Sequence, residues 1–512
     1  MCGIAAEIAT GRPVPGRVAA MLEPIRHRGD GENFGRVLTV AGAVFGCNRL
    51  AIVDRDAAVQ PMSDGSLSVA FNGEIYNHAE LRATLTAHGH RFRTESDTEV
   101  LLHGYRQWRG DLPRHLDGIF AFVVYDADTG AYLCARDRLG VKPLYRARED
   151  GALLLASEIK SFGPLGLVPE TFPPGHAADR NREWSYDSRP TEPWQHDEET
   201  AAAELGRLLD EAVYKRTRTD LPIGVIYSGG VDSAAVLGLA LRHHPDVTAI
   251  SVGLPGAADL PVAVRSCAEL GVRHVVRDLD IDDLIRRLPA IVRQTETFEL
   301  VDIMDACVMA PAFEAARALG IKVVLVGDGS DEQFAGYELF RDHPEPVELS
   351  RYRVRNLHRT DLHRVDRASM LHSVEARVPF LDPAVVDLAW RLPMDYKRRD
   401  GIEKWILRKA ISGVIPDYLA WRPKVRMPEG TGLLFQLIEY ARDQRVDLDE
   451  ELVERLHIDS QEMAYCLRSY VDSGYPVPRA RYRRSGWDYA PNGYFQFDDA
   501  PLSGALEGSP AR

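Results

Sequence analysis

Short apolar runs separated by turn residues characterise roughly the first third of the chain, up to about residue 165. The intervening turns include segments 126–130 and 149–151, which are rich in Asp and Gly. Strands spaced this closely predict an antiparallel, layered domain. Two helices are also expected, near residues 18–27 and 78–88. The strand-like runs are 38–44, 68–71, 120–125, 132–135 and 153–156.

A polar, proline-containing stretch then leads to residue 197, and we interpret it as a link between two domains. From residue 198 the pattern changes to alternating strands and helices, which predicts a parallel sheet covered on both faces. After Gly486 the pattern is weak, and we expect a poorly ordered tail. The expected strands are 223–227, 248–252 and 323–326, and the expected helices are 234–243, 262–270 and 310–319.

Length and composition agree with two globular domains. At 512 residues the chain is too long for one ordinary core, and its net charge of −14 argues against a general nucleic-acid binder. No apolar run reaches the ~18 residues of a membrane span and no signal segment is visible, so we expect a cytoplasmic protein. The cysteines lack the spacing of a metal site or a disulfide framework. They are Cys2, Cys47, Cys134, Cys267, Cys307 and Cys466.

The second residue is a candidate nucleophile. Removal of Met1 would leave a thiol and a free α-amine on Cys2, so that a nucleophile and a base belong to one residue. The ordinary pKa of an α-amine, about 7.7–8.0, suits a general base near neutral pH. A Met-Cys start alone would more often be an ordinary terminal cysteine, and the assignment depends on the motifs that follow it.

Those motifs are unremarkable singly, since Asn-Gly after a strand is usually only a turn. Their order and spacing, however, resemble the glutaminase domain of class II glutamine amidotransferases. The motifs are Met1-Cys2-Gly3-Ile4, Arg26-His27-Arg28-Gly29, Asn48-Arg49-Leu50, Asn72-Gly73-Glu74-Ile75-Tyr76-Asn77, Ser96-Asp97-Thr98-Glu99 and Arg136-Asp137-Arg138-Leu139-Gly140.

The resemblance implies an αββα N-terminal-nucleophile hydrolase in which Cys2 attacks the side-chain amide of glutamine and releases ammonia. Asn72 and the Gly73 backbone would form the oxyanion hole. Arg49 would hold the glutamine α-carboxylate, for which a planar bidentate donor is suited. Glu74 and Asp97 would take the amide or amine end of the substrate. The full expected glutamine-binding set is Arg49, Leu50, Ile52, Val53, Asn72, Gly73, Glu74 and Asp97.

A second constellation follows the strand at 223–227, in Ser228-Gly229-Gly230-Val231-Asp232-Ser233. Glycines let the backbone approach phosphates, and the N-terminus of the next helix supplies N–H groups for anions. The sequence differs from the phosphate loop of kinases and GTPases and resembles the pyrophosphate loop of ATP pyrophosphatases. Asp232 and Asp331, each after a strand, are candidate Mg²⁺ ligands.

Together the motifs resemble a glutamine-hydrolysing asparagine synthetase of the bacterial type. The resemblance implies an α/β parallel-sheet ATP-pyrophosphatase domain that adenylates an acceptor carboxylate, which ammonia from glutamine then converts to an amide. Lys424 would steady the charge of the reacting species, and Asp328 would take part in adenylation. The expected ATP-binding residues are Tyr227, Ser228, Gly229, Gly230, Asp232, Ser233, Val252, Val326 and Gly327. The expected domains are 1–165, 198–440 and an extension, 441–512, of unassigned role.

The acceptor end departs from the family pattern. After Glu296-Thr297-Phe298, the aspartate-binding Thr-Thr-x-Arg of the family is replaced by Val301, Asp302 and Met304. The arginine that would pair with the aspartate α-carboxylate is absent, and nearby carboxylates repel a dianion by ~1 kcal/mol or more per close contact. The adenylation-step glutamate of the family is the shorter Asp328. We therefore expect an acceptor other than aspartate, less anionic, more apolar or amine-bearing.

Three alternatives to an amidotransferase with an acceptor other than aspartate remain open. The differences around residues 301–304 can be drift or misalignment at a true aspartate site. A β-lactam-synthetase-like cyclase shares the two-domain plan, although such enzymes typically lack the cysteine present here. A non-catalytic relative would be expected to have lost Asp232 or Asp331. Expected partners are small molecules only (glutamine, ATP and a carboxylic acid acceptor), with no nucleic acid or membrane. The oligomeric state is left open, and the resemblance suggests a homodimer because dimers are common in that family.

Overall fold

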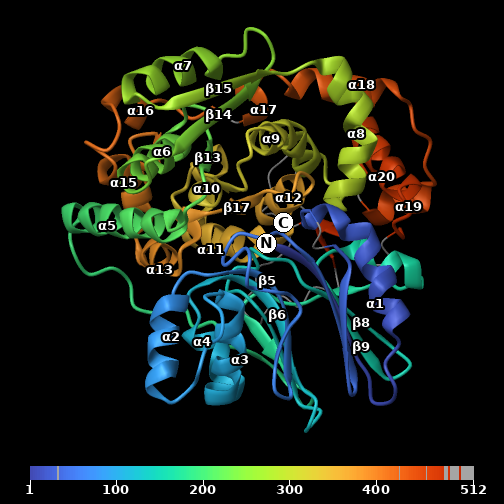
Figure 1. The fold of residues 1–512 in the computed structure, drawn as a ribbon. Coiled ribbons are helices and arrows are strands. Elements are labelled where there is room, and N and C mark those ends of the chain that lie inside the picture. Colours follow the sequence, from blue (N-terminus) through green and yellow to red (C-terminus); the bar gives the residue numbers. More distant parts are fainter. Residues whose placement is uncertain (32–33, 426, 457, 478–481, 485–494, 498–512) are drawn as a thin grey trace.

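The first domain contains two antiparallel sheets, each with six strands (Figure 1). The computed structural model describes residues 1–31, 34–425, 427–456, 458–477, 482–484 and 495–497. The first sheet has the order β10 (Glu170–Thr171), β8 (Tyr145–Glu149), β9 (Ala152–Ala156), β1 (Cys2–Ile8), β3 (Ala43–Arg49) and β2 (Arg36–Val40). The second has the order β12 (Glu183–Ser185), β11 (His176–Ala178), β7 (Tyr132–Arg136), β6 (Gly118–Asp126), β5 (Leu67–Ile75) and β4 (Met62–Asp64).

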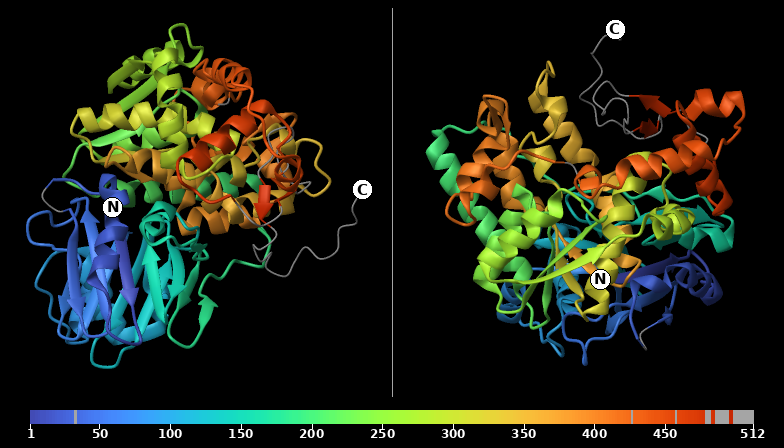
Figure 2. Two further views of the ribbon diagram at one scale, coloured as in Figure 1. Left: turned by 90° about the vertical axis from the view of Figure 1, so that its right-hand side faces the viewer. Right: turned by 90° about the horizontal axis from the view of Figure 1, so that it is seen from above.

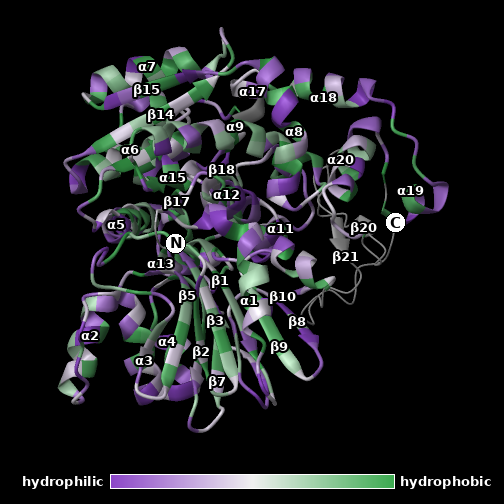
Figure 3. Ribbon diagram, turned by 45° about the vertical axis from the view of Figure 1, so that its right-hand side comes forward, coloured by the Kyte–Doolittle hydropathy of each residue, from purple (hydrophilic) through white to green (hydrophobic). Residues whose placement is uncertain are grey.

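Helices cover the outer faces of both sheets, which confirms the expected αββα architecture. Helix α1 (Pro15–Leu22), with the 3₁₀ segments η1 (Glu23–Arg28) and η3 (Ile159–Leu165), packs on the first sheet. Helices α2 (His78–Ala87) and α3 (Asp97–Trp108) pack on the second, followed by η2 (Arg109–Asp111) and α4 (Leu112–His115). Apolar residues from both sheets form the layer between them, and β1, β3 and β5 are largely hydrophobic in Figure 3.

Several first-domain elements differ from the sequence expectation. The run 38–44 is a hairpin of β2 and β3 that turns at Gly42, where φ is +82°. Helix α3, which the apolar pattern did not predict, starts at the Ser96 cap, whose side chain accepts from Thr98 N–H. Part of the polar stretch expected to be a link instead adds β10, β11 and β12 to the sheet edges, because its backbone groups find partners there.

The second domain is built around a parallel sheet in the order β15 (Arg273–Asp278), β14 (Val247–Gly253), β13 (Ile223–Ile226), β16 (Val323–Leu325) and β17 (Glu375–Arg377). Successive side chains of its strands point to opposite faces of the sheet and pack in two different hydrophobic clusters. Val323 and Leu325 pack with α5 (Glu198–Thr217) and α6 (Val231–His243), whereas Val324 and Val326 pack with α8 (Ile281–Thr295), α9 (Leu300–Ala318) and α12 (Asp361–Met370). The expected parallel sheet covered on both faces is confirmed.

The remaining elements surround this sheet. The helices are α7 (Asp259–Leu270), α10 (Ser330–Gln333), α11 (Pro346–Asn356), α13 (Pro383–Arg391), α14 (Met394–Lys397), α15 (Trp405–Ala410), α16 (Asp417–Ala420), α17 (Met427–Gly430), α18 (Leu434–Asp443), α19 (Glu450–Leu456) and α20 (Gln461–Asp472). The 3₁₀ segments are η4 (Glu338–Phe340), η5 (Leu357–Arg359) and η6 (Pro379–Leu381). Two small hairpins pair β18 (Arg398–Arg399) with β19 (Ile402–Glu403), and β20 (Tyr482–Arg484) with β21 (Phe495–Phe497).

The C-terminal helices belong to the core of the second domain. Helix α20 packs on α8 and α9, and α18 packs on α8 and α20 (Figure 2). The hydroxyl of Tyr475 donates to the carbonyl of Arg293 at 2.6 Å. The tail expected beyond Gly486 lies outside the described residues apart from 495–497. Among the helices that the structure describes, none is both long and apolar enough to cross a membrane.

Candidate active sites

Cys2 begins strand β1 and is buried where the first domain meets the second (Figure 1). Its backbone N–H donates to Asn72 Oδ1 at 3.0 Å, and its carbonyl accepts from Arg28 Nε at 3.1 Å. The side-chain amide of Gln60 lies 3.7 Å from the Cys2 sulfur. The nitrogen that becomes the α-amine when Met1 is removed therefore already has an acceptor.

The surroundings of the Cys2 thiol favour its ionised form. A hydrogen bond with Cys47 lowers the pKa of Cys2 to about 6; burial opposes this effect, and the α-ammonium of Met1 and the Arg49 guanidinium add to it. Cys47 lies opposite Ile4 on the neighbouring strand, and hence on the same face of the sheet as Cys2. A thiol with such a pKa is largely thiolate at neutral pH, which is the form that attacks an amide.

Asn72 and Gly73 have the features of an oxyanion site. Asn72 Nδ2 is buried and makes no hydrogen bond to the described residues, although buried amides are normally satisfied. Gly73 has φ of +154°, and a Cβ there would lie 2.1 Å from the carbonyl oxygen of Ile119. Only glycine fits at this position, directly beside the unpaired amide donor.

The Arg49 side chain braces the loop that follows β3. Its guanidinium donates to the three backbone carbonyls of residues 53–55 at 3.0–3.1 Å. Leu50 and Ile52 are buried and join the Met1 side chain in a hydrophobic cluster shared with the second domain. The structure therefore places Arg49 near Cys2, with its hydrogen bonds directed to the loop.

Glu74 and Asp97 are both buried near the N-terminus of the chain. Burial raises the pKa of Glu74 to about 8 and that of Asp97 to about 6. Glu74 Oε2 accepts from Arg377 Nη2 of the second domain at 3.1 Å, and Asp97 Oδ2 accepts from the Ile75 N–H at 3.1 Å. Two carboxyl groups thus surround the position expected for the substrate's amine.

Buried ion pairs join this site to the second domain. The Met1 ammonium lies 3.0 Å from Glu375 Oε2, and Glu375 also accepts from Arg377 Nε at 2.6 Å. Arg28, which holds the Cys2 carbonyl, donates to both carboxylate oxygens of Asp366, at 2.7 and 3.0 Å. The Met1 pair exists only before Met1 is removed. Because breaking a buried pair costs roughly 3–5 kcal/mol, the Arg28–Asp366 pair fixes the two domains against each other in either form.

In the second domain, the segment 228–233, which contains the loop after β13 and the first residues of α6, lines a cavity. We refer to it as the loop 228–233. Gly229 has φ of +73°, and its carbonyl accepts from Arg422 Nη1 at 3.0 Å. Gly327, after the neighbouring strand β16, comes so close that an added Cβ would lie 3.0 Å from the Asp232 Cβ. The cavity therefore opens at the carboxyl ends of adjacent strands, the usual ligand position in parallel sheets.

Two lysines converge on the carboxylates of this cavity. Lys404 Nζ lies 2.5 Å from Asp232 Oδ2 and 2.7 Å from Asp331 Oδ1, and Lys424 Nζ lies 2.6 Å from Asp331 Oδ2. Burial opposes ionisation of Asp331, but the two ammonium groups outweigh it and lower its pKa. The Ser330 hydroxyl donates to Asp232 Oδ1 at 2.6 Å. The structure brings Asp232, Asp331 and Lys424, three of the expected site residues, together at one end of the cavity.

Some expected ATP-site residues lie away from the cavity wall. The Tyr227 side chain is buried and hydrogen-bonds Ser266, at 2.6 Å between their hydroxyl oxygens. Val252 is buried in the core packed against α9. Gly229 is also not among the lining residues. The cavity is lined by the other expected ATP-site residues, Ser228, Gly230, Asp232, Ser233, Val326 and Gly327, and by Asp328, which was expected to take part in adenylation.

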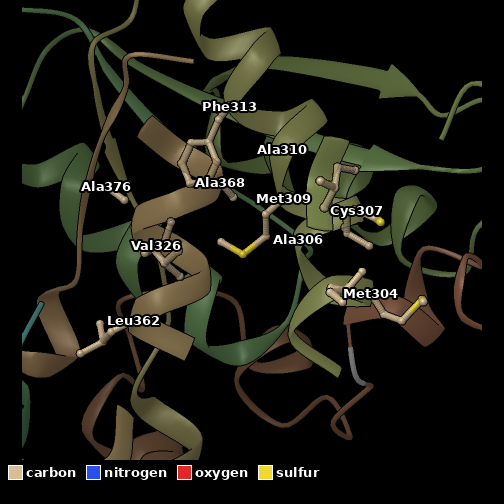
Figure 4. Packing of buried hydrophobic residues seen from close by; sticks show 14 of the residues in the cluster. Met304, Ala306, Cys307, Met309, Ala310, Phe313, Val326, Leu362, Ala368 and Ala376 are labelled. Carbon is tan, nitrogen blue, oxygen red and sulfur yellow. The ribbon is translucent and has the colours of Figure 1, made fainter. Parts of the chain in front are cut away.

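Helix α9 presents one face to the same cavity. Val301, Asp305 and Met309 line it, at the spacing of residues on one helical face. Met304, expected at the acceptor, packs instead in the hydrophobic core, and Figure 4 shows it directed away from Met309 and Val326. The cavity-facing residues of α9 are thus 301, 305 and 309.

Four aspartates converge on one guanidinium at this end of the cavity. Arg364 on α12 contacts Asp305 and lies 2.9 Å from an oxygen of Asp328 and 2.9 Å from an oxygen of Asp361. Asp302 is fully buried, 4.0 Å from Arg364. Burial raises the pKa of Asp302 well above its usual range and that of Asp328 to about 6.

The sequence analysis did not identify four residues that lie at the two sites in the structure. They are Cys47 and Gln60 near Cys2, and Arg364 and Lys404 at the cavity of the second domain. Arg364 had a detectable signal, because Asp361 lies three positions before it on an amphipathic helix. Lys404 had none, since its partner Asp232 is 172 positions away and its own segment is ordinary.

Comparison with known proteins agrees with this two-site arrangement. A family described as a glutamine amidotransferase domain matches residues 1–175, and one described as asparagine synthase matches residues 204–352 and 343–491. The chain is similar to the glutamine-hydrolyzing asparagine synthetase B of Escherichia coli strain K12, at 32% identity over 493 residues, covering 89% of this chain and 87% of that protein.

A plant relative is similarly close. The glutamine-hydrolyzing asparagine synthetase 2 of Lotus japonicus is 34% identical over 476 residues, covering 84% of this chain and 78% of that protein. Among solved structures, the glutamine PRPP amidotransferase from B. subtilis covers 54% of this chain and 65% of its own, at 17% identity and a TM-score of 0.32. The family matches and relatives span both domains, and the chain therefore belongs to the family of glutamine-hydrolysing asparagine synthetases, as an amidotransferase of that type.

Proposed function

We propose that the chain transfers ammonia from glutamine to a carboxylic acid other than aspartate, at the expense of ATP. In the first domain, the Cys2 thiolate attacks the side-chain carbonyl of glutamine, ammonia leaves, and water hydrolyses the thioester to glutamate. The unpaired Asn72 amide and the Gly73 N–H are placed to stabilise the oxyanion. Glu74 and Asp97 are placed to hold the substrate amine, while Arg49 braces the adjoining loop.

In the second domain, the acceptor carboxylate attacks the α-phosphorus of ATP and pyrophosphate leaves. Ammonia then attacks the acyl adenylate, which gives the amide and AMP. The loop 228–233 surrounds the phosphates, because its glycines and the start of α6 offer backbone N–H groups. Lys404 and Lys424 supply positive charge beside the leaving pyrophosphate.

The residues present fit a magnesium ion. Asp232 and Asp331 come from neighbouring strand ends and already share the Lys404 ammonium, so two carboxylates flank a position that accommodates a cation. These two residues would hold Mg²⁺, whose remaining ligands are typically phosphate oxygens and water. When bound, Mg²⁺ neutralises charge on the phosphates.

The proposal of a different acceptor depends on the position of Arg364. Aspartate would bring a second carboxylate into the cavity, and that group would need a cation of its own. The guanidinium of Arg364 is already bound to Asp305, Asp328 and Asp361. Helix α9 itself presents Val301, Asp305 and Met309 to the cavity. None of these three side chains carries a positive charge that could bind a second carboxylate of the acceptor.

Pyrophosphate release tests this proposal. With ATP, Mg²⁺ and glutamine, we expect added aspartate to raise pyrophosphate release by less than about twofold, because Arg364 is already bound to Asp305, Asp328 and Asp361 when the second carboxylate of aspartate arrives. Glutaminase activity should be measurable in the same samples. Aspartate-dependent release with asparagine as the product would show a true asparagine synthetase and overturn the choice of acceptor.

A second prediction concerns the thiol pair. Because Cys47 lowers the pKa of Cys2 to about 6, glutaminase activity should rise through pH 6 as the thiolate forms. Cys47→Ala should move this acid limb upward by about one pH unit or more, because the neighbouring donor to the thiolate is lost. The measurement is the pH dependence of kcat/KM for glutamine.

Cys134→Ala is the matched control, since Cys134 is another buried thiol of the same core, where it donates to the Ala178 carbonyl. It should leave the acid limb in place. If Cys47→Ala also leaves it in place, the thiol pair does not set the reactivity of Cys2.

A further inference from the structure

Arg377 belongs to the second domain, but its side chain reaches the candidate glutamine site of the first. The residue ends strand β17, and its side chain is 1% exposed. Its Nε donates to Glu375 Oε1 at 2.6 Å, and its Nη1 donates to the carbonyl of Arg216 on α5 at 2.8 Å. These two contacts within the second domain direct Nη2 at Glu74 Oε2 of the first domain, at 3.1 Å.

The backbone of Arg377 is fixed as firmly as its guanidinium. Its carbonyl accepts from the Val326 N–H at 3.0 Å, and it lies opposite Leu325 in the parallel sheet. A planar guanidinium held on a rigid strand binds a carboxylate in one orientation with little further loss of freedom. Arg377 is therefore suited to fix the position of Glu74.

The charge of Arg377 also affects the ionisation of Glu74. Burial raises the pKa of Glu74 to about 8, and the charges of Asp97 and Glu375 add to this rise, whereas Arg377 opposes it. The Met1 ammonium acts in the same direction as Arg377, but only until Met1 is removed. In the processed chain, Arg377 is thus the cation that still favours the carboxylate form of Glu74.

One oxygen of Glu74 remains available to a ligand. Within the part of the chain that the structure describes, the side chain of Glu74 accepts one hydrogen bond, at Oε2 from Arg377. The nearby ring of Tyr76 lies between two second-domain guanidiniums, with the Cζ atoms of Arg216 and Arg377 at 4.6 and 5.8 Å from its centre. The second domain thus holds the end of β5, while Glu74 Oε1 can accept from a substrate ammonium.

We propose that Arg377 is a positioning residue for glutamine, because it holds Glu74 in place and favours the ionised form that binds the ammonium group of the substrate. This inference rests on the proposed function, in which Glu74 and Asp97 hold that ammonium. Arg377 acts through Glu74 and not on the substrate directly. The first domain therefore has its full affinity for glutamine only when the second domain is docked against it.

Hydrolysis of two substrates by the full-length protein tests the proposal. They are glutamine and 4-carbamoylbutanoate, which is glutamine without its α-ammonium. We expect kcat/KM at pH 8 to favour glutamine, because a charge-assisted hydrogen bond to the ammonium is lost in the analogue. Arg377→Gln should lower this preference by about tenfold, mainly through KM for glutamine, and should change kcat/KM for the analogue by less than about twofold.

A conservative variant and a double variant separate positioning from a merely structural role. Arg377→Lys keeps a positive charge beside Glu74 and should lower the preference by only about threefold. Glu74→Gln should remove most of the preference, and adding Arg377→Gln to it should have no further effect, since the two residues act as one unit.

Arg138→Gln is the matched control, because it removes another guanidinium that crosses between the domains, to Asp387 at 3.0 Å. It should keep the full preference for glutamine. Pyrophosphate release with ammonium chloride should persist in each variant, which shows that the second domain is folded.

An unchanged preference in Arg377→Gln, or an equal loss of activity toward both substrates, overturns the inference. Where Arg377→Gln does not fold, Arg377→Lys decides the question in the natural and the Glu74→Gln backgrounds. A lowered preference in the natural background alone supports the inference, and any other result overturns it. Absence of a preference for glutamine in the natural protein would contradict the proposed role of Glu74 and Asp97, and with it this inference.

Discussion

Replacing Cys2 by Ala is expected to abolish glutamine use and to leave ammonia-dependent amide formation intact. The substitution removes the one atom that attacks the glutamine carbonyl, and loss of a catalytic nucleophile typically lowers turnover by at least ~10⁴-fold. It keeps the backbone N–H that donates to Asn72 and the carbonyl that accepts from Arg28. The site should therefore remain folded, and added ammonium chloride should reach the second domain as before.

The measurement is glutamate formation in parallel with pyrophosphate release, with glutamine or ammonium chloride as the nitrogen source. Cys134→Ala, a buried thiol of the same core, should keep both activities. Glutamate formation that survives Cys2→Ala would show that the nucleophile has been assigned to the wrong residue. Loss of ammonia-dependent activity as well would show that Cys2 supports the interface between the domains.

The second of these outcomes matters because the two sites share buried contacts. Asp366, which binds Arg28 below Cys2, lies on α12 only two positions after Arg364, which contacts Asp305 at the wall of the second-domain cavity. The charged groups of α12 thus contact both the surroundings of Cys2 and the cavity of the second domain. A rigid helix with contacts at both ends can hold the two active sites in a fixed relation.

The fold classes of the two domains were predicted from the sequence, and the candidate site residues were chosen from short motifs. The sequence placed Asn72 and Gly73 directly after a strand, whereas both lie within β5, which continues to Ile75. The apolar run of β13 does end shortly before Ser228 and its glycines, as the local pattern indicated. Strand spacing predicted an antiparallel, layered first domain and strand–helix alternation predicted the parallel sheet, whereas the αββα arrangement was expected from the resemblance to class II amidotransferases.

What could not be predicted depends on contacts between distant segments. Lys404 reaches Asp232 across 172 positions and Arg28 reaches Asp366 across 338, and no local pattern encodes such pairs. Sequence matching also placed Met304 at the acceptor, whereas the helical period turns Asp305 to the cavity and Met304 to the core. Which face of α9 is turned to the cavity depends on how the helix packs in the folded domain.

Asp232→Asn is expected to remove adenylation. The substitution keeps the size and one acceptor oxygen of the side chain, so the Ser330 hydroxyl can still donate to it. It removes the negative charge that holds Lys404 at 2.5 Å and that would hold Mg²⁺. Losing a charged group that organises phosphate binding lowers turnover by roughly 10²–10³-fold, so pyrophosphate release should nearly vanish with glutamine or with ammonia.

Asp246→Asn is the matched control, because Asp246 is exposed just before β14 and lies outside the cavity. It should leave pyrophosphate release unchanged. In Asp232→Asn, glutamate formation from glutamine should persist, since Cys2, Asn72 and Gly73 all lie in the first domain. Cys2→Ala and Asp232→Asn would then divide the reaction into its two halves. Unaltered pyrophosphate release in Asp232→Asn would instead place the adenylation site elsewhere than the loop at 228–233.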